Sequence, residues 1–171
     1  LRLMFRMVRD NFNLNAGVVF TPQKTEFTYR YQNVDTVINR NVFNWSPQIN
    51  FRYKFSKVSQ MRIQYNGASS EPSMTDMIPI TDDSNPLNIT KGNPGLKPSF
   101  SHYVRLFFND YITSHNQAIM ANVNFNTTQN SVSNMVTYDP ATGGRTSMPM
   151  NINGNWNVNG GFMYNASIDS V

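Results

Sequence analysis

The chain of 171 residues is thinly charged, because Asp, Glu, Lys and Arg together make up 14% of it, against about 25% in an average soluble domain. Its 25 Asn residues and its aromatic content of 13% are typical neither of a helical bundle nor of an acidic disordered tail, and the absence of Cys excludes disulfides and thiolate metal sites. The formal net charge of +4 comes from basic residues scattered along the chain, and every apolar stretch is shorter than the about 18 residues of a membrane-spanning helix, so we expect neither a nucleic-acid partner nor a helical span.

Alternation of apolar and polar residues predicts β-strands, because successive side chains of a strand point to opposite faces. The alternation is clearest from Phe43 to Phe55 and from Asn151 to Ile168. In chain order, the predicted strands cover residues 1–7, 12–20, 43–55, 61–65, 100–108, 119–125 and 151–168. The apolar faces of these strands carry no Asp, Glu, Lys or Arg.

The two faces of the predicted strands suit two different environments. A lipid-facing Arg or Lys costs roughly 2–4 kcal/mol at the bilayer midplane, so a barrel wall keeps charge off its outer face. The residues that we expect to face lipid are Phe43, Trp45, Ile49, Phe51, Tyr53, Phe55, Trp156, Val158, Phe162 and Tyr164. The residues that we expect to face a hydrated lumen are Arg52, Lys54, Arg62, Arg105, Asn122, Asn124, Asn153 and Asn155.

The links between strands alternate in length. Short links at residues 9–10, 56–59 and 110–116 alternate with long ones at residues 22–40, 71–98 and 130–149. Tight turns on one rim and extended loops on the other are typical of an outer-membrane barrel. Alternation within residues 27–31 and 135–138 predicts that two of the long links extend the strands as hairpins.

The predicted fold is therefore all-β, an antiparallel up-and-down transmembrane β-barrel segment of about seven strands. Residues 1–171 would form part of one outer-membrane β-barrel domain without a plug. The smallest single-chain bacterial barrels have eight strands and plugged transporters about 22, so we expect further strands of the same protein to complete the wall. A soluble β-sandwich alternates in the same way, but its strands average about five or six residues, whereas a strand across lipid needs about 9–11.

One loop contains a more specific motif, Gly92-Asn93-Pro94-Gly95-Leu96-Lys97-Pro98. It resembles a signature of the barrel of TonB-dependent outer-membrane receptors, especially the Bacteroidota outer-membrane β-barrel group that includes the SusC-like receptors. The strand pair before it, residues 45–57 and 61–65, is also similar to that family. Pro94 and Pro98 fix φ and the two glycines permit turns, so the motif is expected to stiffen the loop, with ligand contact as the second interpretation.

The resemblance implies import of a bulky nutrient, such as a glycan, a peptide or a metal complex, across the bacterial outer membrane. It also implies four partners: outer-membrane lipid, a plug domain, the TonB complex acting through that plug, and a surface lipoprotein as a further candidate. Two alternatives remain open from the sequence. One is a plugless outer-membrane barrel that acts as an anchor or adhesin, and the other is a secreted soluble β-sandwich that binds carbohydrate.

Catalytic and metal chemistry find little support in the sequence. His102 and His115 are the only histidines, and without Cys they are expected to be interfacial or turn residues. Asp76, Asp82 and Asp83 lie in one loop that lacks the spacing of a calcium site, so a solvated acidic loop is expected. Carboxylates are too sparse to nominate a general acid and base. We expect no enzyme activity and no cofactor.

Overall fold

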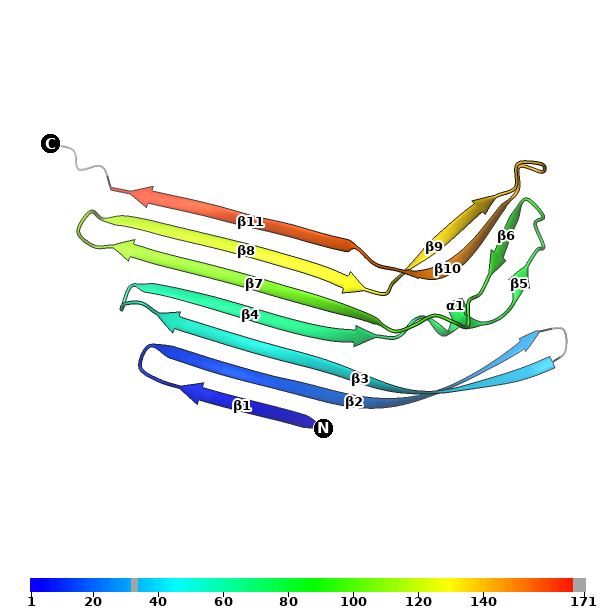
Figure 1. The fold of residues 1–171 in the computed structure, drawn as a ribbon, viewed down its shortest axis with the longest axis horizontal. Coiled ribbons are helices and arrows are strands. Elements are labelled where there is room, and N and C mark those ends of the chain that lie inside the picture. Colours follow the sequence, from blue (N-terminus) through cyan, green and yellow to red (C-terminus); the bar gives the residue numbers. More distant parts are fainter. Residues whose placement is uncertain (32–33, 168–171) are drawn as a thin grey trace.

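The computed structural model describes residues 1–31 and 34–167. Figure 1 shows one large sheet and a smaller one beyond its end. The large sheet has seven antiparallel strands in the order β1-β2-β3-β4-β7-β8-β11. Their bounds are β1 Arg2–Val8, β2 Phe12–Tyr31, β3 Val34–Lys54, β4 Ser59–Ser70, β7 Ser99–Ile112, β8 Gln117–Gln129 and β11 Asn155–Ala166. The described part of the chain is thus all-β apart from one helical turn, and its large sheet is open, as the sequence predicts for a barrel segment.

The second sheet is built from the two longer loops. It contains β5 Thr81–Asp82, β6 Asn88–Lys91, β10 Arg145–Ile152 and β9 Ser131–Tyr138, in that order, and the helical turn α1 Met74–Met77 precedes β5. The pair β6 and β10 is parallel, with Arg145 opposite Asn88. None of the helices in the described residues is long and apolar enough to span a membrane.

The short links lie together at one end of the large sheet, and the long loops lie at the other (Figure 1). The β1–β2 link is closed by a hydrogen bond from the Arg9 N–H to the Phe12 carbonyl at 2.8 Å, and the β3–β4 link by one from the Phe55 N–H to the Ser59 carbonyl at 3.0 Å. In the β7–β8 link, Asn116 has φ +47°, a left-handed conformation that Asn tolerates better than most residues. The predicted alternation of short and long links is confirmed.

The β2–β3 pair continues well beyond its neighbours. β2 has 20 residues and β3 has 21, about twice the length needed to cross lipid. The paired register runs without a break from Phe12 opposite Tyr53 to Tyr31 opposite Val34. The predicted hairpin extension therefore forms a two-stranded ribbon that projects past the sheet (Figure 1).

The predicted strand over residues 151–168 is wrong at its start. Gly154 has φ +96° and separates β10 from β11, so Asn151 and Ile152 pair with β9 instead of β8. Asn130, with φ +51°, makes the matching bend between β8 and β9, and its N–H donates to Asn153 Oδ1 at 2.7 Å. Two facing positive-φ residues thus bend one long hairpin into two parts. Ile168 lies outside the described residues.

The molecule has almost no interior of its own. Leu96, 4% exposed, is the buried hydrophobic residue among those described, whereas Phe43, Trp156 and Phe162 are 62%, 67% and 72% exposed. A soluble monomer rarely exposes an apolar surface of more than a few hundred Å² unless that surface contacts a partner or a membrane. The large sheet is therefore built to be covered on its apolar face.

Candidate functional site

Directly opposed residues of an antiparallel pair share a face, so the register sorts the side chains of all seven strands. One row on the apolar face crosses the whole sheet: Phe5, Ala16, Ile49, Tyr65, Val104, Phe125 and Val158. The ten residues predicted to face lipid all belong to this apolar face, Phe55 continuing it just past the end of β3. The side chains of β3 and β11, far apart in sequence, thus join in one surface.

Aromatic side chains gather at both ends of the apolar face. Toward the long loops, Trp45 stacks on Phe100 with centroids 4.6 Å apart, and Phe100 meets His102 edge-on at 4.8 Å. His102 Nδ1 also lies 3.0 Å from the Tyr65 hydroxyl. Toward the short links, Phe55 contacts Tyr53 at a centroid distance of 4.9 Å. Aromatic residues with polar tips are typical of the two interfaces of a membrane.

The opposite face is polar and rich in amides. Its central row reads Arg6, Asn15, Asn50, Gln64, Arg105, Asn124 and Asn159. Arg105 Nε donates to Asn124 Oδ1 at 2.9 Å, and Asn124 Nδ2 donates to Asn159 Oδ1 at 3.0 Å. Arg105 Nη2 also donates to the Tyr103 hydroxyl at 2.7 Å. The amides therefore form a connected hydrogen-bonded layer across three strands.

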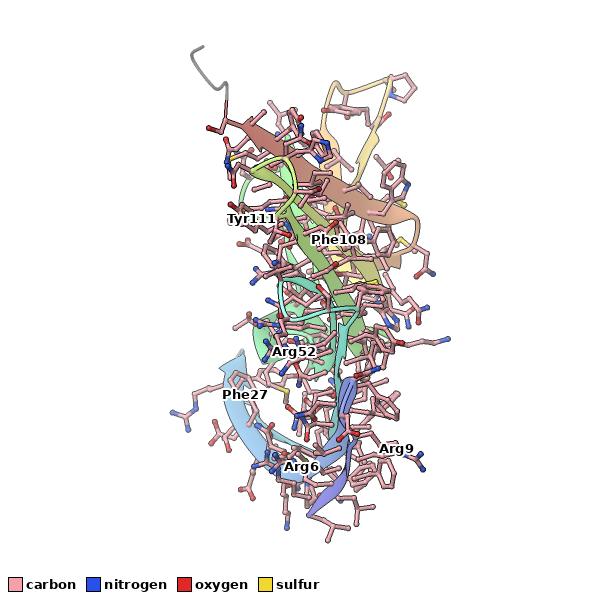
Figure 2. All side chains as sticks on the ribbon, turned by 90° about the vertical axis from the view of Figure 1, so that its left-hand side faces the viewer. Arg6, Arg9, Phe27, Arg52, Phe108 and Tyr111 are labelled. Atoms are coloured by element: carbon pink, nitrogen blue, oxygen red, sulfur yellow. The ribbon has the colours of Figure 1, made fainter. Side chains whose placement is uncertain are left out.

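Of the residues predicted to face the lumen, seven lie on this polar face and Asn153 does not. Arg52, Arg62 and Asn122 share one row, Lys54 lies in the next row toward the short links, and Asn155 lies in a row nearer the long loops. Asn153 sits in the bend between β10 and β11, where its side chain accepts the Asn130 N–H. Figure 2 shows Arg6 and Arg52 on one side of the sheet and Phe108 on the other.

A cavity of about 560 Å³ opens at the short-link end of the polar face. Its lining includes Arg52, Lys54, Lys57 and Gln60, with Asp10 as the acidic residue among them. Arg52 Nε donates to the neutral Gln60 Oε1 at 2.8 Å. Like charges placed directly opposite each other destabilise a strand pair, and Arg52 is directly opposite Arg62.

The loop motif joins the two long loops. Asn93 Nδ2 donates to the Pro149 carbonyl at 2.9 Å, and Asn93 Oδ1 accepts the Gly95 N–H at 2.9 Å. Asn151 Oδ1 accepts the Lys97 N–H at 2.8 Å.

The backbone of the motif also approaches a neighbouring segment too closely for a side chain at Gly92. A Cβ on Gly92 would lie 1.8 Å from the Ile78 carbonyl oxygen. These contacts tie the motif to the second long loop and leave no space for a side chain at Gly92.

A second cavity, of about 340 Å³, lies between α1, β5, β6 and β10. Among the motif residues, Gly92 lines it, together with Asp76, Asp82 and Pro149. The Ser84 hydroxyl and N–H both hydrogen-bond to Asp82 and lower the pKa of its carboxyl group. In the described ranges, no three His, Cys, Asp or Glu residues come together in a way that would hold a metal ion.

One ion pair was not anticipated from the sequence. Arg40 Nη2 lies 2.8 Å from Glu71 Oε2, both side chains are 18% exposed, and Arg40 also contacts Met77 Sδ. The pair lines a cavity of about 340 Å³ with Pro98 of the motif. Arg40 lies in β3 and Glu71 directly follows β4, so the two residues are far apart in the sequence and no local pattern predicts their pairing.

Comparison with known proteins identifies a family and a structural likeness. A model of the family described as "Outer membrane protein beta-barrel family" matches residues 6–171. No curated protein matches the chain in sequence. Among experimental structures, the chain is similar to a double mutant of the Serratia marcescens hemophore receptor HasR in complex with its hemophore HasA and heme. The TM-score is 0.54 at 15% identity, and the match covers 94% of this chain but 30% of the receptor chain. The likeness therefore concerns the fold of one part of a longer barrel.

Proposed function

The chain belongs to the outer membrane protein beta-barrel family and lies in the bacterial outer membrane, and from this premise we propose that it is part of the barrel wall of a TonB-dependent receptor. Residues 1–171 form one stretch of that wall, and further strands of the same protein close it. The receptor imports a bulky nutrient and catalyses no reaction.

The observation that carries the proposal is the separation of the two faces in register across all seven strands. The apolar face, including Phe51, Val158 and Phe162, meets lipid, because every strand contributes uncharged side chains to its middle and Asp110 of β7 lies at its short-link end. The polar face, including Arg62, Arg105 and Asn124, lines a hydrated lumen, where amides hydrogen-bond without adding charge. A lumen lined in this way admits a large hydrophilic solute.

The finer features of the proposal follow from the loop motif and the receptor likeness. The motif at residues 92–98 supports membership of the SusC-like group, and the receptor likeness supports uptake of a large cargo. The cargo class is a glycan, a peptide or a metal complex. Energy comes from the TonB complex through a plug inside the barrel, and a surface lipoprotein is a candidate partner at the long loops.

Uptake and fractionation test the proposal together. Membranes from the native host are blotted with an antibody against residues 72–98, with and without boiling. A band much larger than 19.6 kDa that shifts on heating is expected for a closed barrel. Uptake of labelled glycans, peptides and metal chelates is then compared in cells with and without TonB, and one cargo is expected to enter only when TonB is present.

A plugless anchor or adhesin is the second candidate, favoured by the four-stranded sheet that the long loops form at one rim. It predicts the same heat-dependent shift, but no TonB-dependent uptake and a binding partner at the cell surface. Membership of the outer-membrane family excludes the third interpretation, a secreted soluble β-sandwich. The TonB comparison therefore separates the two candidates that remain.

A further inference from the structure

We propose that a cavity at the long-loop end of the apolar face binds the sugar head group of a glycolipid in the outer leaflet of the membrane. The cavity has a volume of about 340 Å³ and is lined by residues 40–45 of β3, by Ser69 and Glu71 at the end of β4, and by residues 98–100 at the start of β7. We call it the rim cavity. The site requires that the apolar face meets lipid, as proposed above, but it does not require that the protein transports a cargo.

The rim cavity forms where β3 parts from β4. Pairing between the two strands ends at Gln48 opposite Asn66. The next residue of β3 toward the long loops is Pro47, which has no N–H to continue the ladder. Beyond Pro47, the Ser69 hydroxyl accepts the Trp45 N–H at 3.0 Å, so a side chain takes the place of a backbone partner. The sequence of β3 therefore opens the sheet at this point.

One wall of the rim cavity belongs to the surface that meets lipid. Phe43 and Trp45 of the apolar face line it and are 62% and 43% exposed. The Trp45 ring stacks on the Phe100 ring, with centroids 4.6 Å apart. Both lie toward the long loops, which face the cell exterior in outer-membrane barrels. An exposed aromatic face at this level is available to the C–H groups of a sugar ring.

The other wall of the rim cavity is polar but carries no net charge. Arg40 Nη2 lies 2.8 Å from Glu71 Oε2, and both side chains are 18% exposed. Because the two charges balance, the cavity differs from the basic clusters that select anionic lipids. Glu71 Oε1 is buried and accepts no hydrogen bond from the described residues. This oxygen is therefore an acceptor for an O–H group of a ligand.

A glycolipid with an uncharged sugar matches both walls. A sugar hydroxyl both donates and accepts hydrogen bonds, so it can donate to Glu71 Oε1 and accept from the Arg40 guanidinium. The C–H face of the same sugar then covers Trp45, and the acyl chains continue along the apolar face. A phosphate in this position would be repelled by the Glu71 carboxylate. A free sugar would lack the contacts that the acyl chains make with the apolar face.

Lipid retention by the full-length protein tests the rim cavity. The protein is placed in phosphatidylcholine nanodiscs that contain either monogalactosyl diacylglycerol, a neutral glycolipid, or phosphatidic acid, an anionic lipid without a sugar. Native mass spectrometry then measures the lipid that stays bound. We expect the wild type to retain the glycolipid at least tenfold better than phosphatidic acid. Equal retention of the two lipids would overturn the proposal.

Two tryptophan variants show whether the glycolipid occupies this cavity. Trp45→Leu should lower glycolipid retention at least tenfold, because it removes the ring that packs against the sugar. Trp156→Leu is the matched control, since Trp156 lies on the same apolar face and is 67% exposed, but does not line the rim cavity. Its glycolipid retention should equal that of the wild type. Equal losses in the two variants contradict the proposal.

A charge variant separates binding from a purely structural role of the ion pair. Glu71→Gln keeps the shape of the side chain but leaves the charge of Arg40 unbalanced. Retention should therefore shift from the glycolipid toward phosphatidic acid, while the heat-dependent gel shift is preserved. A folded variant with unchanged lipid preference would refute the assignment of Arg40 and Glu71 to the site. Displacement of the glycolipid by an equal concentration of methyl galactoside would show that the site takes a soluble sugar, and would overturn the lipid as occupant.

The outcomes distinguish the glycolipid site from the proposed function. TonB-dependent uptake together with equal retention of the two lipids leaves the receptor function in place and overturns the rim cavity as a glycolipid site. Selective glycolipid retention that depends on Trp45, without TonB-dependent uptake, supports the site and overturns the receptor function alone.

Discussion

The side-chain amide of Asn151 hydrogen-bonds to both the N–H and the carbonyl group of Lys97. Oδ1 accepts the Lys97 N–H at 2.8 Å, and Nδ2 donates to the Lys97 carbonyl at 3.0 Å. Nδ2 also donates to the Asn130 carbonyl at 2.8 Å. A single amide, 54 residues beyond Lys97 in the sequence, thus ties the motif loop to the bend between β8 and β9.

Asn151→Asp is expected to loosen this junction. The carboxylate cannot donate a hydrogen bond and would face two carbonyl oxygens, Lys97 O and Asn130 O. An unsatisfied polar group of this kind costs about 1–3 kcal/mol. Limited proteolysis of intact cells should cut the variant faster within residues 72–98. Asn134→Asp, at an exposed position of β9, is the control, and equal cutting of the two variants would contradict the role of Asn151.

Replacement by Ala is expected to disturb the folded loop much more at Gly92 than at Gly95. A Cβ at Gly92 would lie 1.8 Å from the Ile78 carbonyl oxygen, which is backbone, whereas a Cβ at Gly95 would lie 3.1 Å from Asn93 Oδ1, which can shift. Gly92→Ala should therefore displace the loop, at a cost of about 1–3 kcal/mol for overpacking. Binding of an antibody against the folded loop measures the effect. Similar losses in both variants would show that the Ile78 contact is unimportant.

The assignment of the two faces is tested by adjacent residues of β8. Val123 lies on the apolar face opposite Leu106, and Asn122 lies on the polar face opposite Phe107. Val123→Arg should lower the free energy of unfolding by roughly 2–4 kcal/mol if the residue is near the bilayer midplane. Asn122→Arg should change it much less. Urea unfolding of the full-length barrel in lipid vesicles measures both, and the reverse order would mean that the faces are exchanged.

The turn of the β9–β10 hairpin should respond to acid. The Ala141 N–H and the Thr142 hydroxyl hydrogen-bond to Asp139 and lower the pKa of its carboxyl group from the ordinary value of 3.8. A lowered pKa means that the charged form stabilises the turn above pH 3.8, and that this contribution is lost as the pH falls through the lower, folded value.

Hydrogen exchange at the Ala141 and Gly143 amides measures this response. Their protection, corrected for intrinsic exchange, should be constant from neutral pH down to about the unfolded pKa and fall below it. Asp139→Asn keeps the shape of the side chain without the charge, and its protection should not vary over the same range. A wild-type turn with constant protection at acid pH would contradict the role of Asp139.

The local alternation of apolar and polar residues was sufficient to predict the large sheet, but it was not sufficient to predict the structure of the loops. The alternation from Phe43 to Phe55 fixes which face is apolar, because a period of two needs no information from elsewhere in the chain. The bend at Gly154 interrupts an alternation that continues unbroken in the sequence, so the predicted strand began too early.

The candidate site, too, could be predicted from the sequence only in part. Arg52 and Arg62 could be placed on the polar face from their own strands, but their direct opposition depends on the register of β3 and β4. Two of its contacts join residues from separate loops or strands: the hydrogen bond between Asn151 and Lys97, and the ion pair between Arg40 and Glu71. Such contacts have no local signature, and the parallel pairing of β6 with β10 has none either.

The junction between the two long loops also constrains how their lengths can change in evolution. Because β6 pairs with β10 and Asn93 donates to the Pro149 carbonyl, the loops over residues 71–98 and 130–154 form one structural unit. An insertion in one loop shifts a strand on which the other depends. The two loops are therefore expected to vary in length together or be exchanged as a pair, while the β2–β3 ribbon, joined to them through Arg40 and Glu71, is freer to diversify at its tip.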